Sequence, residues 1–233
     1  MPVLGSVLLS RNMNIEIQGS RYNATVQSAA MRRYYRLHAI IYDATRWSFL
    51  WGRNQILKQI PIEKTTNATF LEIGCGTGRN LNEIANQFPS AQLLGIDVSR
   101  DMLEKAAKTL FQNQHRVQLL ETAYPSELPT TPQVILYSYA LTMFNPGWEA
   151  AIEQAWKDLP VGGYIAIVDF HDTPFKWMER WMGFNHVRMD GHLLPFAATR
   201  FSAVHQSVHK AYFGWWRYFM YVGQKTIADT SAL

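Results

Sequence analysis

Residues Phe70 to Gly78 read Phe-Leu-Glu-Ile-Gly-Cys-Gly-Thr-Gly, and this stretch decides the fold. A run of apolar residues gives way to three glycines spaced two apart, and residues 80–88 then follow helical spacing. This change of pattern predicts a strand, a tight turn and a helix. A second apolar run ends at Asp97, 19 residues beyond Gly78, about where a parallel nucleotide-binding fold places its ribose-binding carboxylate. The unit predicts a cofactor pocket.

Strand and helix patterns alternate on both sides of this unit. The predicted strands are Thr69–Ile73, Ala91–Ile96, Val117–Leu120, Val134–Tyr139 and Tyr164–Asp169. The predicted helices are Arg79–Gln87, Arg100–Leu110 with Ser99 as its cap, and Trp148–Lys157. Such alternation predicts right-handed crossovers and a doubly wound, mostly parallel α/β sheet.

The pattern changes after Asp169. A Trp-rich amphipathic stretch covers Pro174 to Met189, and two further strands are expected at Arg200–Val204 and Trp215–Tyr221. Two strands at the end of the chain predict an antiparallel hairpin added at the edge of the sheet.

The N-terminal part is expected to form a lid. From Val26 to Ile60 apolar and aromatic residues recur three or four apart, which predicts two helices broken near residues 44–48, the second ended by Pro61. Residues 1–25 lack periodicity and are expected to pack loosely. We therefore divide the chain into an extension with lid helices (1–60) and the α/β domain (61–233), within one structural unit.

Composition limits the partners and the compartment. The first 60 residues hold eight Lys or Arg against two acids, a net charge of +6, which suits nucleic acid, an anionic membrane surface or solvent alike. Cys75 is the lone cysteine, so no intramolecular disulfide forms, and no paired His or Cys spacing predicts a metal site. With no convincing secretory signal or membrane span, we expect a cytoplasmic protein, soluble or peripheral to the inner membrane face.

Charge distinguishes between candidate cofactors. A dinucleotide fingerprint needs a third glycine where this chain has Arg79, and Glu72 precedes the first glycine by two residues. An acid at this point repels a pyrophosphate but attracts the amino group and sulfonium of S-adenosylmethionine. We therefore expect S-adenosylmethionine, with Asp97 accepting hydrogen bonds from the ribose hydroxyls.

The residues Leu71 to Gly78 with Asp97 resemble the first two motifs of class I S-adenosylmethionine-dependent methyltransferases, and Leu159 to Gly163 resembles the turn before the fifth strand of that family. The resemblance implies a Rossmann-like methyltransferase sheet and S-adenosylhomocysteine as product. Residues assigned to cofactor binding by this match are Glu72, Gly74, Cys75, Gly76, Gly78, Asp97, Val98 and Ser99, with Thr122, Ala123 and Ser138. Many family members carry Asp-Ala after the third strand, whereas Glu121 and Thr122 precede Ala123 here, so either residue can contact adenine.

Two other stretches bear on the methyl acceptor. Tyr35 to Arg53 resembles the N-terminal signature of the methyltransferase of betaine-lipid (diacylglyceryl-N,N,N-trimethylhomoserine) synthesis, and Ser138 to Met143 and Val168 to Phe170 resemble its later segments. The resemblance implies three N-methylations of a lipid-borne homoserine amine, after a partner 3-amino-3-carboxypropyl transferase has attached the homoserine group. Bacterial phosphatidylethanolamine N-methyltransferases share much of this pattern. A non-catalytic membrane- or RNA-binding protein on the same scaffold is the remaining alternative.

Candidate residues near the reaction follow from these assignments. Tyr42 and Arg46 are expected to close over the methionine end of the cofactor, although Tyr42 also suits a helix core and Arg46 also suits a pair with Asp43. Near the acceptor, the expected catalytic residues are Tyr35, Tyr139 and His171, together with Asp169. His171 also suits a plain loop position.

Basic and aromatic residues predict a rim at a lipid headgroup layer, with burial in the core or RNA binding as alternatives. These residues are Arg32, Arg33 and Arg36 beside Tyr34 and Tyr35, together with Trp177, Trp181, Trp215 and Trp216. A lipid amine is the expected substrate, and no nucleic acid is expected.

Overall fold

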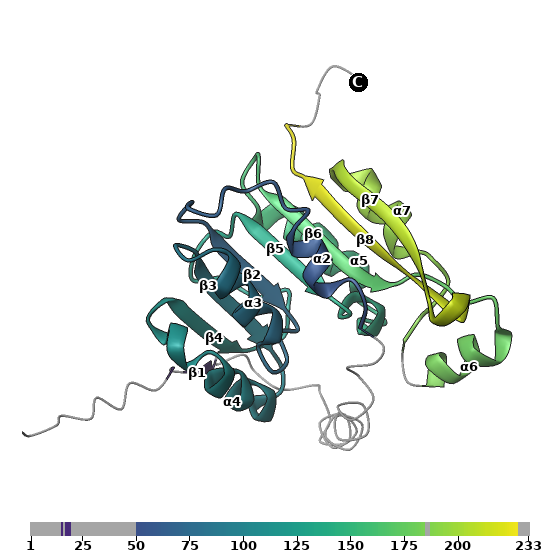
Figure 1. The fold of residues 1–233 in the computed structure, drawn as a ribbon, viewed down its shortest axis with the longest axis horizontal. Coiled ribbons are helices and arrows are strands. Elements are labelled where there is room, and N and C mark those ends of the chain that lie inside the picture. Colours follow the sequence, from purple (N-terminus) through teal and green to yellow (C-terminus); the bar gives the residue numbers. More distant parts are fainter. Residues whose placement is uncertain (1–14, 16, 20–49, 185–186, 228–233) are drawn as a thin grey trace, which may run out of the picture.

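The computed structural model describes residues 15, 17–19, 50–184 and 187–227, and its centre is an eight-stranded sheet (Figure 1). The strand order is β1-β4-β3-β2-β5-β6-β8-β7. The strands are β1 (Ile17–Gly19), β2 (Thr69–Ile73), β3 (Gln92–Asp97), β4 (Val117–Glu121), β5 (Val134–Ser138), β6 (Tyr164–Phe170), β7 (Ser202–Ala211) and β8 (Trp216–Gln224). β1 to β6 pair in parallel, whereas β8 is antiparallel to β6 and β7 is antiparallel to β8. The predicted doubly wound sheet with a C-terminal antiparallel hairpin is confirmed.

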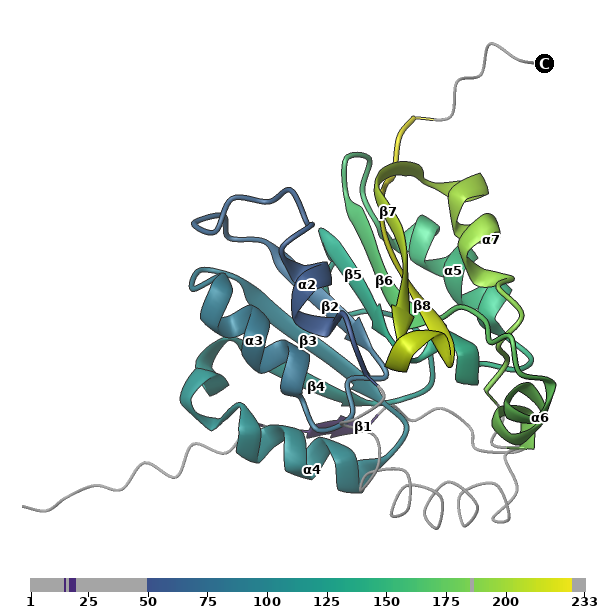
Figure 2. The ribbon, with the colours of Figure 1, turned by 45° about the vertical axis from the view of Figure 1, so that its right-hand side comes forward.

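Helices cover both faces of the sheet (Figures 1 and 2). The α-helices are α2 (Arg53–Leu57), α3 (Arg79–Gln87), α4 (Arg100–Thr109), α5 (Trp148–Asp158), α6 (Lys176–Phe184) and α7 (Leu193–Arg200). Short 3₁₀ helices are η1 (Phe111–Arg116), η2 (Leu141–Met143) and η3 (Tyr212–Gly214). The helices α2, α3 and α4 lie on one face, and α5 and α7 lie on the other.

Alternation along each central strand fills two cores. In β2, Phe70 faces the core under α2, α3 and α4, whereas Leu71 and Ile73 face the core under α5 and α7. Successive side chains of a strand point to opposite faces, so a fully apolar strand is buried on both sides. This explains why β5 is buried along its whole length. The short helix α2 adds Ile56 and Leu57 to the first core, which ties the end of the N-terminal extension to the α/β domain.

The crossover from β4 to β5 lacks the expected alternation. Residues 122–133 form no helix, and the loop instead lays Tyr124 and Leu128 against the core under α5 and α7. A parallel connection needs about a dozen residues to cross the sheet but does not require a helix. Our expectation that strand and helix alternate throughout is therefore wrong at this crossover.

The C-terminal part differs in detail from the prediction. The helix α7 ends where a strand was expected to begin, and β7 runs to Ala211 rather than Val204. Alternating polar residues such as His205, Ser207 and His209 continue β7, because an edge strand with a solvated face needs few apolar positions. The Trp-rich stretch contains α6, which buries Met178 and Met182.

The N-terminal predictions are only partly covered by the described residues. Within residues 1–25, Ile17 to Gly19 pair with Leu119 to Glu121 of β4, so loose packing is wrong for these three residues. Of the two predicted lid helices, only α2 is described, and it ends at Leu57 rather than at Pro61. The division of the chain at residue 60 stays a prediction. In the described part of the chain, every helix is too short or too polar to cross a membrane.

Candidate active site

The candidate site lies where β2 and β5 are neighbours, because the sheet order changes direction between them. Open α/β sheets bind ligands at the carboxyl ends of the strands at such a point. Here β2 runs into the glycine turn and β5 runs into Tyr139. We call this region the carboxyl end of the sheet.

The glycine turn is fixed against β3. The backbone N–H groups of Gly74 and Cys75 both donate to the carbonyl of Ile96, at 2.9 and 3.0 Å. Gly78 begins α3 with a left-handed φ of 75°, and a Cβ there would lie 3.0 Å from Ala106 of α4. Glycine is therefore needed at position 78 both for the backbone and for the close approach of α4.

Glu72 is a buried acid directly beneath this turn. Its side chain is 1% exposed, and its Oε1 accepts a hydrogen bond of 2.6 Å from Asn80 Nδ2 in the first turn of α3. The Oδ1 atom of Asn80 is buried and has no hydrogen-bond partner in the structure. An acid and an amide acceptor side by side form a site suited to an ammonium group.

Cys75 contributes packing and backbone to the turn. Its side chain is 4% exposed, and burial raises the pKa of its thiol, with the charges of Glu72 and Asp97 raising it further. The thiol therefore stays protonated and does not act as a nucleophile.

Asp97 holds together the two segments that follow β2 and β3. Its Oδ2 accepts a 2.8 Å hydrogen bond from Gly76 N, and its Oδ1 accepts a 2.9 Å bond from Ser99 N. Ser99 is confirmed as the cap of α4, because its Oγ accepts from Met102 N. Val98, between them, is 56% exposed and offers an apolar surface beside the carboxylate.

The residues after β4 reach the same region. Thr122 N donates to the carbonyl of Asp97 at 3.2 Å, so Thr122 and Ala123 lie beside the predicted ribose contact. Glu121 instead lies within 3.5 Å of Arg100 at the surface. Of the two alternatives for the adenine contact, Thr122 is thus the residue tied to Asp97.

The carboxyl end of β5 is strained and well anchored. Tyr139 has a left-handed φ of 56°, which is unusual for a residue with a bulky side chain. Its hydroxyl donates to the carbonyl of Trp51 at 2.7 Å, and its ring packs edge-on against Phe170. Next to it, the buried Ser138 accepts a 3.2 Å bond from Arg53 Nε. These contacts fix the start of α2 over the end of β5.

Asp169 anchors the turn that follows β5. Its side chain is fully buried, and it accepts hydrogen bonds from Thr142 Oγ1 at 2.6 Å, Thr142 N at 3.2 Å and Phe170 N at 2.8 Å. Burial raises the pKa of this carboxyl to about 6, against the lowering effect of these hydrogen bonds. The carbonyl of Thr142 in turn accepts from Arg188 N and Asn145 Nδ2. Asp169 thus connects the end of β6 to the turn after β5, and through Thr142 to the segment that holds Arg188.

The sheet separates the predicted catalytic residues His171 and Tyr139. The ring of His171 packs on Phe219, in the core under α5 and α7, whereas Tyr139 belongs to the core under α2, α3 and α4. The Nδ1 atom of His171 is buried without a hydrogen-bond partner, and burial lowers the pKa of its imidazole. Sequence placed both residues at strand ends but did not give the face on which each side chain lies.

Other sequence predictions are not covered or were incomplete. Tyr35, Tyr42 and Arg46 lie outside the described residues, so their roles stay predictions. Sequence reasoning missed Arg53, Asn80 and Thr142 as parts of this region. Asn80 could have been found as a polar residue at the second position of the helix after the glycine turn. Its hydrogen-bond partner Glu72 lies eight residues earlier in the sequence. Among the described residues, no group of His, Cys, Asp or Glu is arranged to hold a metal.

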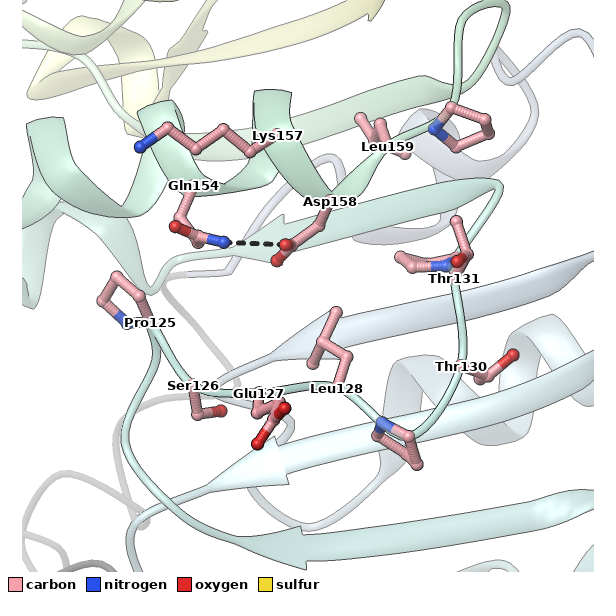
Figure 3. Close-up of a pocket in the computed structure, with 13 residues that line it drawn as sticks. Pro125, Ser126, Glu127, Leu128, Thr130, Thr131, Gln154, Lys157, Asp158 and Leu159 are labelled. Atoms are coloured by element: carbon pink, nitrogen blue, oxygen red, sulfur yellow. Dashed lines mark hydrogen bonds between the residues drawn. The ribbon is translucent and has the colours of Figure 1, made fainter.

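A separate hollow of about 850 Å³ lies between the β4–β5 crossover and the end of α5 (Figure 3). Its lining residues are Pro125 to Pro132, Gln154 and Lys157 to Pro160. Gln154 Nε2 donates to Asp158 Oδ1 at 2.7 Å across its upper wall. Because most of these segments lead into the amino ends of β5 and β6, the hollow is distinct from the glycine turn.

Comparison with known proteins supports the fold and the cofactor turn. Residues 70–163 match a family described as "Methyltransferase domain". A trans-aconitate 2-methyltransferase of Variovorax paradoxus (strain S110) is 30% identical over 113 residues, which are 48% of this chain and 42% of that protein. One from Azoarcus sp. (strain BH72) is 25% identical over 139 residues, 55% of this chain and 53% of that protein. The chain thus spans about half the length of the curated relatives it matches.

Solved structures agree on the architecture. The N-methyltransferase NodS of Bradyrhizobium japonicum WM9, in complex with S-adenosyl-L-homocysteine, superposes with a TM-score of 0.59 at 16% identity, over 74% of this chain and 85% of that one. The phosphoethanolamine N-methyltransferase 2 of Haemonchus contortus gives a TM-score of 0.68 at 14% identity, over 84% of this chain and 59% of that one. At these identities the likeness shows the fold alone. Residues 70–163 thus match a methyltransferase domain, and the fold is the one that the class I motifs predicted.

Proposed function

We propose that the protein is an S-adenosylmethionine-dependent N-methyltransferase that trimethylates the homoserine amine of a diacylglyceryl betaine-lipid precursor. The observation that carries the methyl-transfer part is the glycine turn between two acids, Glu72 and Asp97, at the switch point of the sheet. The acceptor part rests on the resemblance of Tyr35 to Arg53 and of Ser138 to Met143 to the betaine-lipid enzyme.

The residues of the turn fit the cofactor. Glu72 and the unpartnered Oδ1 of Asn80 would hold the amino group of its methionine part. Asp97 would receive the ribose hydroxyls, and the exposed Val98 would pack against the adenine. When bound there, S-adenosylmethionine supplies an activated methyl group.

The acceptor nitrogen attacks as a neutral amine, and the chain mainly has to position it in line with the methyl group. Tyr139 is poorly suited as a base, because its hydroxyl is bound to the Trp51 carbonyl and burial raises its pKa. His171 lies against the opposite core. Because the amine is an ammonium ion at neutral pH, it loses one proton before each of the three attacks, and with neither described candidate placed as a base we assign water as the proton acceptor. Aromatic faces stabilise the quaternary product by about 0.5–2 kcal/mol.

Contacts between the two resembling stretches support their common role. Arg53 Nε donates to Ser138 Oγ and Tyr139 Oη donates to the Trp51 carbonyl, although these partners are 85 and 88 residues apart in sequence. A lipid acceptor also accounts for exposed aromatic residues at the same end of the sheet. The homoserine group would be supplied by a 3-amino-3-carboxypropyl transferase, and the enzyme would work at the cytoplasmic face of the membrane.

A small carboxylate acceptor is the second candidate. It is favoured by the chain's similarity to trans-aconitate 2-methyltransferases and by the guanidinium of Arg53 at the carboxyl end of the sheet. Phosphatidylethanolamine is the third, since its methyltransferases share the sequence pattern.

Lipid mass spectrometry tests the proposal. Cells that express this protein together with the amino-carboxypropyl transferase are expected to accumulate the trimethylated homoserine lipid, while a Gly78→Val variant leaves the unmethylated lipid. Persistence of the unmethylated lipid with the unaltered protein would reject the acceptor. Methylated phosphatidylethanolamine in the same extract is separated by headgroup mass, and purified protein incubated with trans-aconitate tests the carboxylate. Calorimetry with S-adenosylhomocysteine separates all three enzymes from a non-catalytic binding protein.

A further inference from the structure

Four exposed aromatic residues gather beyond the carboxyl end of β6, and we call them the aromatic surface. They are Phe175 (39% exposed), Trp177 (59%), Phe213 (107%) and Trp215 (52%). The rings of Phe175, Trp177 and Trp215 lie 6.2–6.3 Å from one another, so three of the four form one contiguous cluster. A bond of 2.7 Å from Thr173 Oγ1 to the Trp215 carbonyl fixes the loop before α6 to the β7–β8 turn.

The β7–β8 turn presents its aromatic residue at a conformational cost. Tyr212 and Phe213 both have left-handed φ values, 45° and 59°, in a turn where glycine or asparagine is usual. Phe213 nevertheless projects fully into solvent. Backbone strain that holds an apolar ring in water does not serve the folded core, and such outliers concentrate at functional positions.

The helix α6 contributes a second exposed apolar row. It buries Met178 and Met182 on one side and presents Trp177 and Trp181, four residues apart, on the other. An exposed row of this size on a soluble fold indicates an interaction site.

Charge around the aromatic surface indicates the kind of partner. Lys176, Arg180, Lys210 and Arg217 are exposed in these segments; Lys176 pairs with Glu179 and Arg217 with Asp172, so the net charge of the segments is +2. Large aromatic rings flanked by Lys and Arg are the composition of a surface that enters the headgroup layer of an anionic bilayer. Long basic side chains bind lipid phosphates there while Trp and Phe rings enter the apolar boundary.

We propose that the aromatic surface docks the protein on an anionic lipid bilayer. The hairpin tip lies beyond the end of β6, because Tyr218 of β8 pairs with Phe170, the last residue of β6. Docking therefore faces the carboxyl end of the sheet, with the glycine turn, toward the membrane. This inference rests on the proposed function for its purpose, which is access to a lipid headgroup, but bilayer binding is measured without cofactor or acceptor.

Vesicle flotation tests the docking. The full chain is expected to float with phosphatidylcholine vesicles that contain about 30% phosphatidylglycerol and to bind pure phosphatidylcholine more weakly. Phe213→Ser and Trp177→Ser should each lower the partition coefficient about tenfold, because each removes an inserted ring. Phe111→Ser is the matched control, since Phe111 is 53% exposed on η1 at the amino end of β4 and should leave binding unchanged. Circular dichroism melts establish that the variants are folded.

Three results would overturn the inference. The first is that the protein does not float with anionic vesicles. The second is that Phe111→Ser lowers the partition coefficient as much as Phe213→Ser does. The third is that Phe213→Ser changes the oligomeric state in sedimentation, which would assign the surface to a second copy of the chain. Methyl transfer to detergent-dispersed homoserine lipid separates this inference from the proposed function. Transfer without vesicle binding rejects docking alone, and vesicle binding through the aromatic surface without transfer rejects the acceptor alone.

Discussion

The pH dependence of stability should report directly on Asp169. Its carboxyl has a pKa of about 6, raised by burial from the ordinary value of 3.8. The folded chain therefore binds this proton more tightly than the unfolded chain between about pH 4 and pH 6. This contribution is fully present below the unfolded value and is lost as pH rises through the folded value. The shift corresponds to about 3 kcal/mol of lost stability across that range.

Asp169→Asn removes this pH dependence but also changes one hydrogen bond. The amide oxygen can still accept from Thr142 Oγ1 and Phe170 N, whereas the new NH₂ group would face Thr142 N, 3.2 Å from the present Oδ2. Two facing donors cost about 1–3 kcal/mol. At pH 7.5 this loss is offset by the relief of about 3 kcal/mol from removing a buried charge. At pH 4.5 most of the relief is absent, so the variant should be the less stable protein.

Urea unfolding of both proteins at about pH 4.5, 5.5, 6.5 and 7.5, values on both sides of the folded pKa of about 6, measures the effect. The difference in unfolding free energy should change by about 2–3 kcal/mol in favour of Asp169→Asn as pH rises. Asp101→Asn, at the exposed start of α4, serves as the control for loss of one negative charge. A difference that stays constant from the lowest to the highest pH would refute the raised pKa of Asp169.

Three further variants test the cofactor turn. Asp97→Ala removes the acceptor of two backbone bonds and should lower the affinity for S-adenosylhomocysteine at least about 100-fold in calorimetry, since charge-assisted bonds contribute about 1.5–3 kcal/mol each. Glu72→Gln keeps an acceptor for Asn80 but removes the charge. It should lower the affinity for S-adenosylhomocysteine about tenfold or more and leave the affinity for adenosine unchanged. Equal losses of affinity for both ligands would contradict an ammonium site. Gly95→Ala would place a Cβ 2.8–2.9 Å from three packed side chains and should lower the unfolding free energy by about 1–3 kcal/mol in urea.

The sequence was sufficient for the central sheet because its signals there are local. Apolar runs flanked by glycine or by a capping residue such as Ser99 define β2, β3, α3 and α4 within a few residues. The glycine turn and Asp97 were found for the same reason, since the spacing of the glycines and the acid is set by one strand-turn-helix unit and the strand that follows.

The remainder depends on contacts between distant segments. β1 has three residues and forms by pairing with β4, about 100 residues later, so its own pattern is too short to identify it. At the crossover of residues 122–133 a loop, not a helix, covers the sheet. The hydrophobic pattern of the sequence does not show that such a loop packs on the core. His171 was placed at the correct strand end, but its face depends on packing against Phe219 of β8.

Acceptor choice should therefore be sought outside the region shared with other methyltransferases. The family match covers residues 70–163 and so includes the glycine turn and Ser138 but not Trp51 or Arg53. Yet Trp51 and Arg53 are hydrogen-bonded to the residues at the carboxyl end of β5. The relatives match over only about half their length, and one fold serves enzymes with unrelated acceptors. Their names thus bear on the reagent more than on the acceptor, and under the proposed function the contact between Arg53 and Ser138 joins the acceptor-binding and cofactor-binding parts.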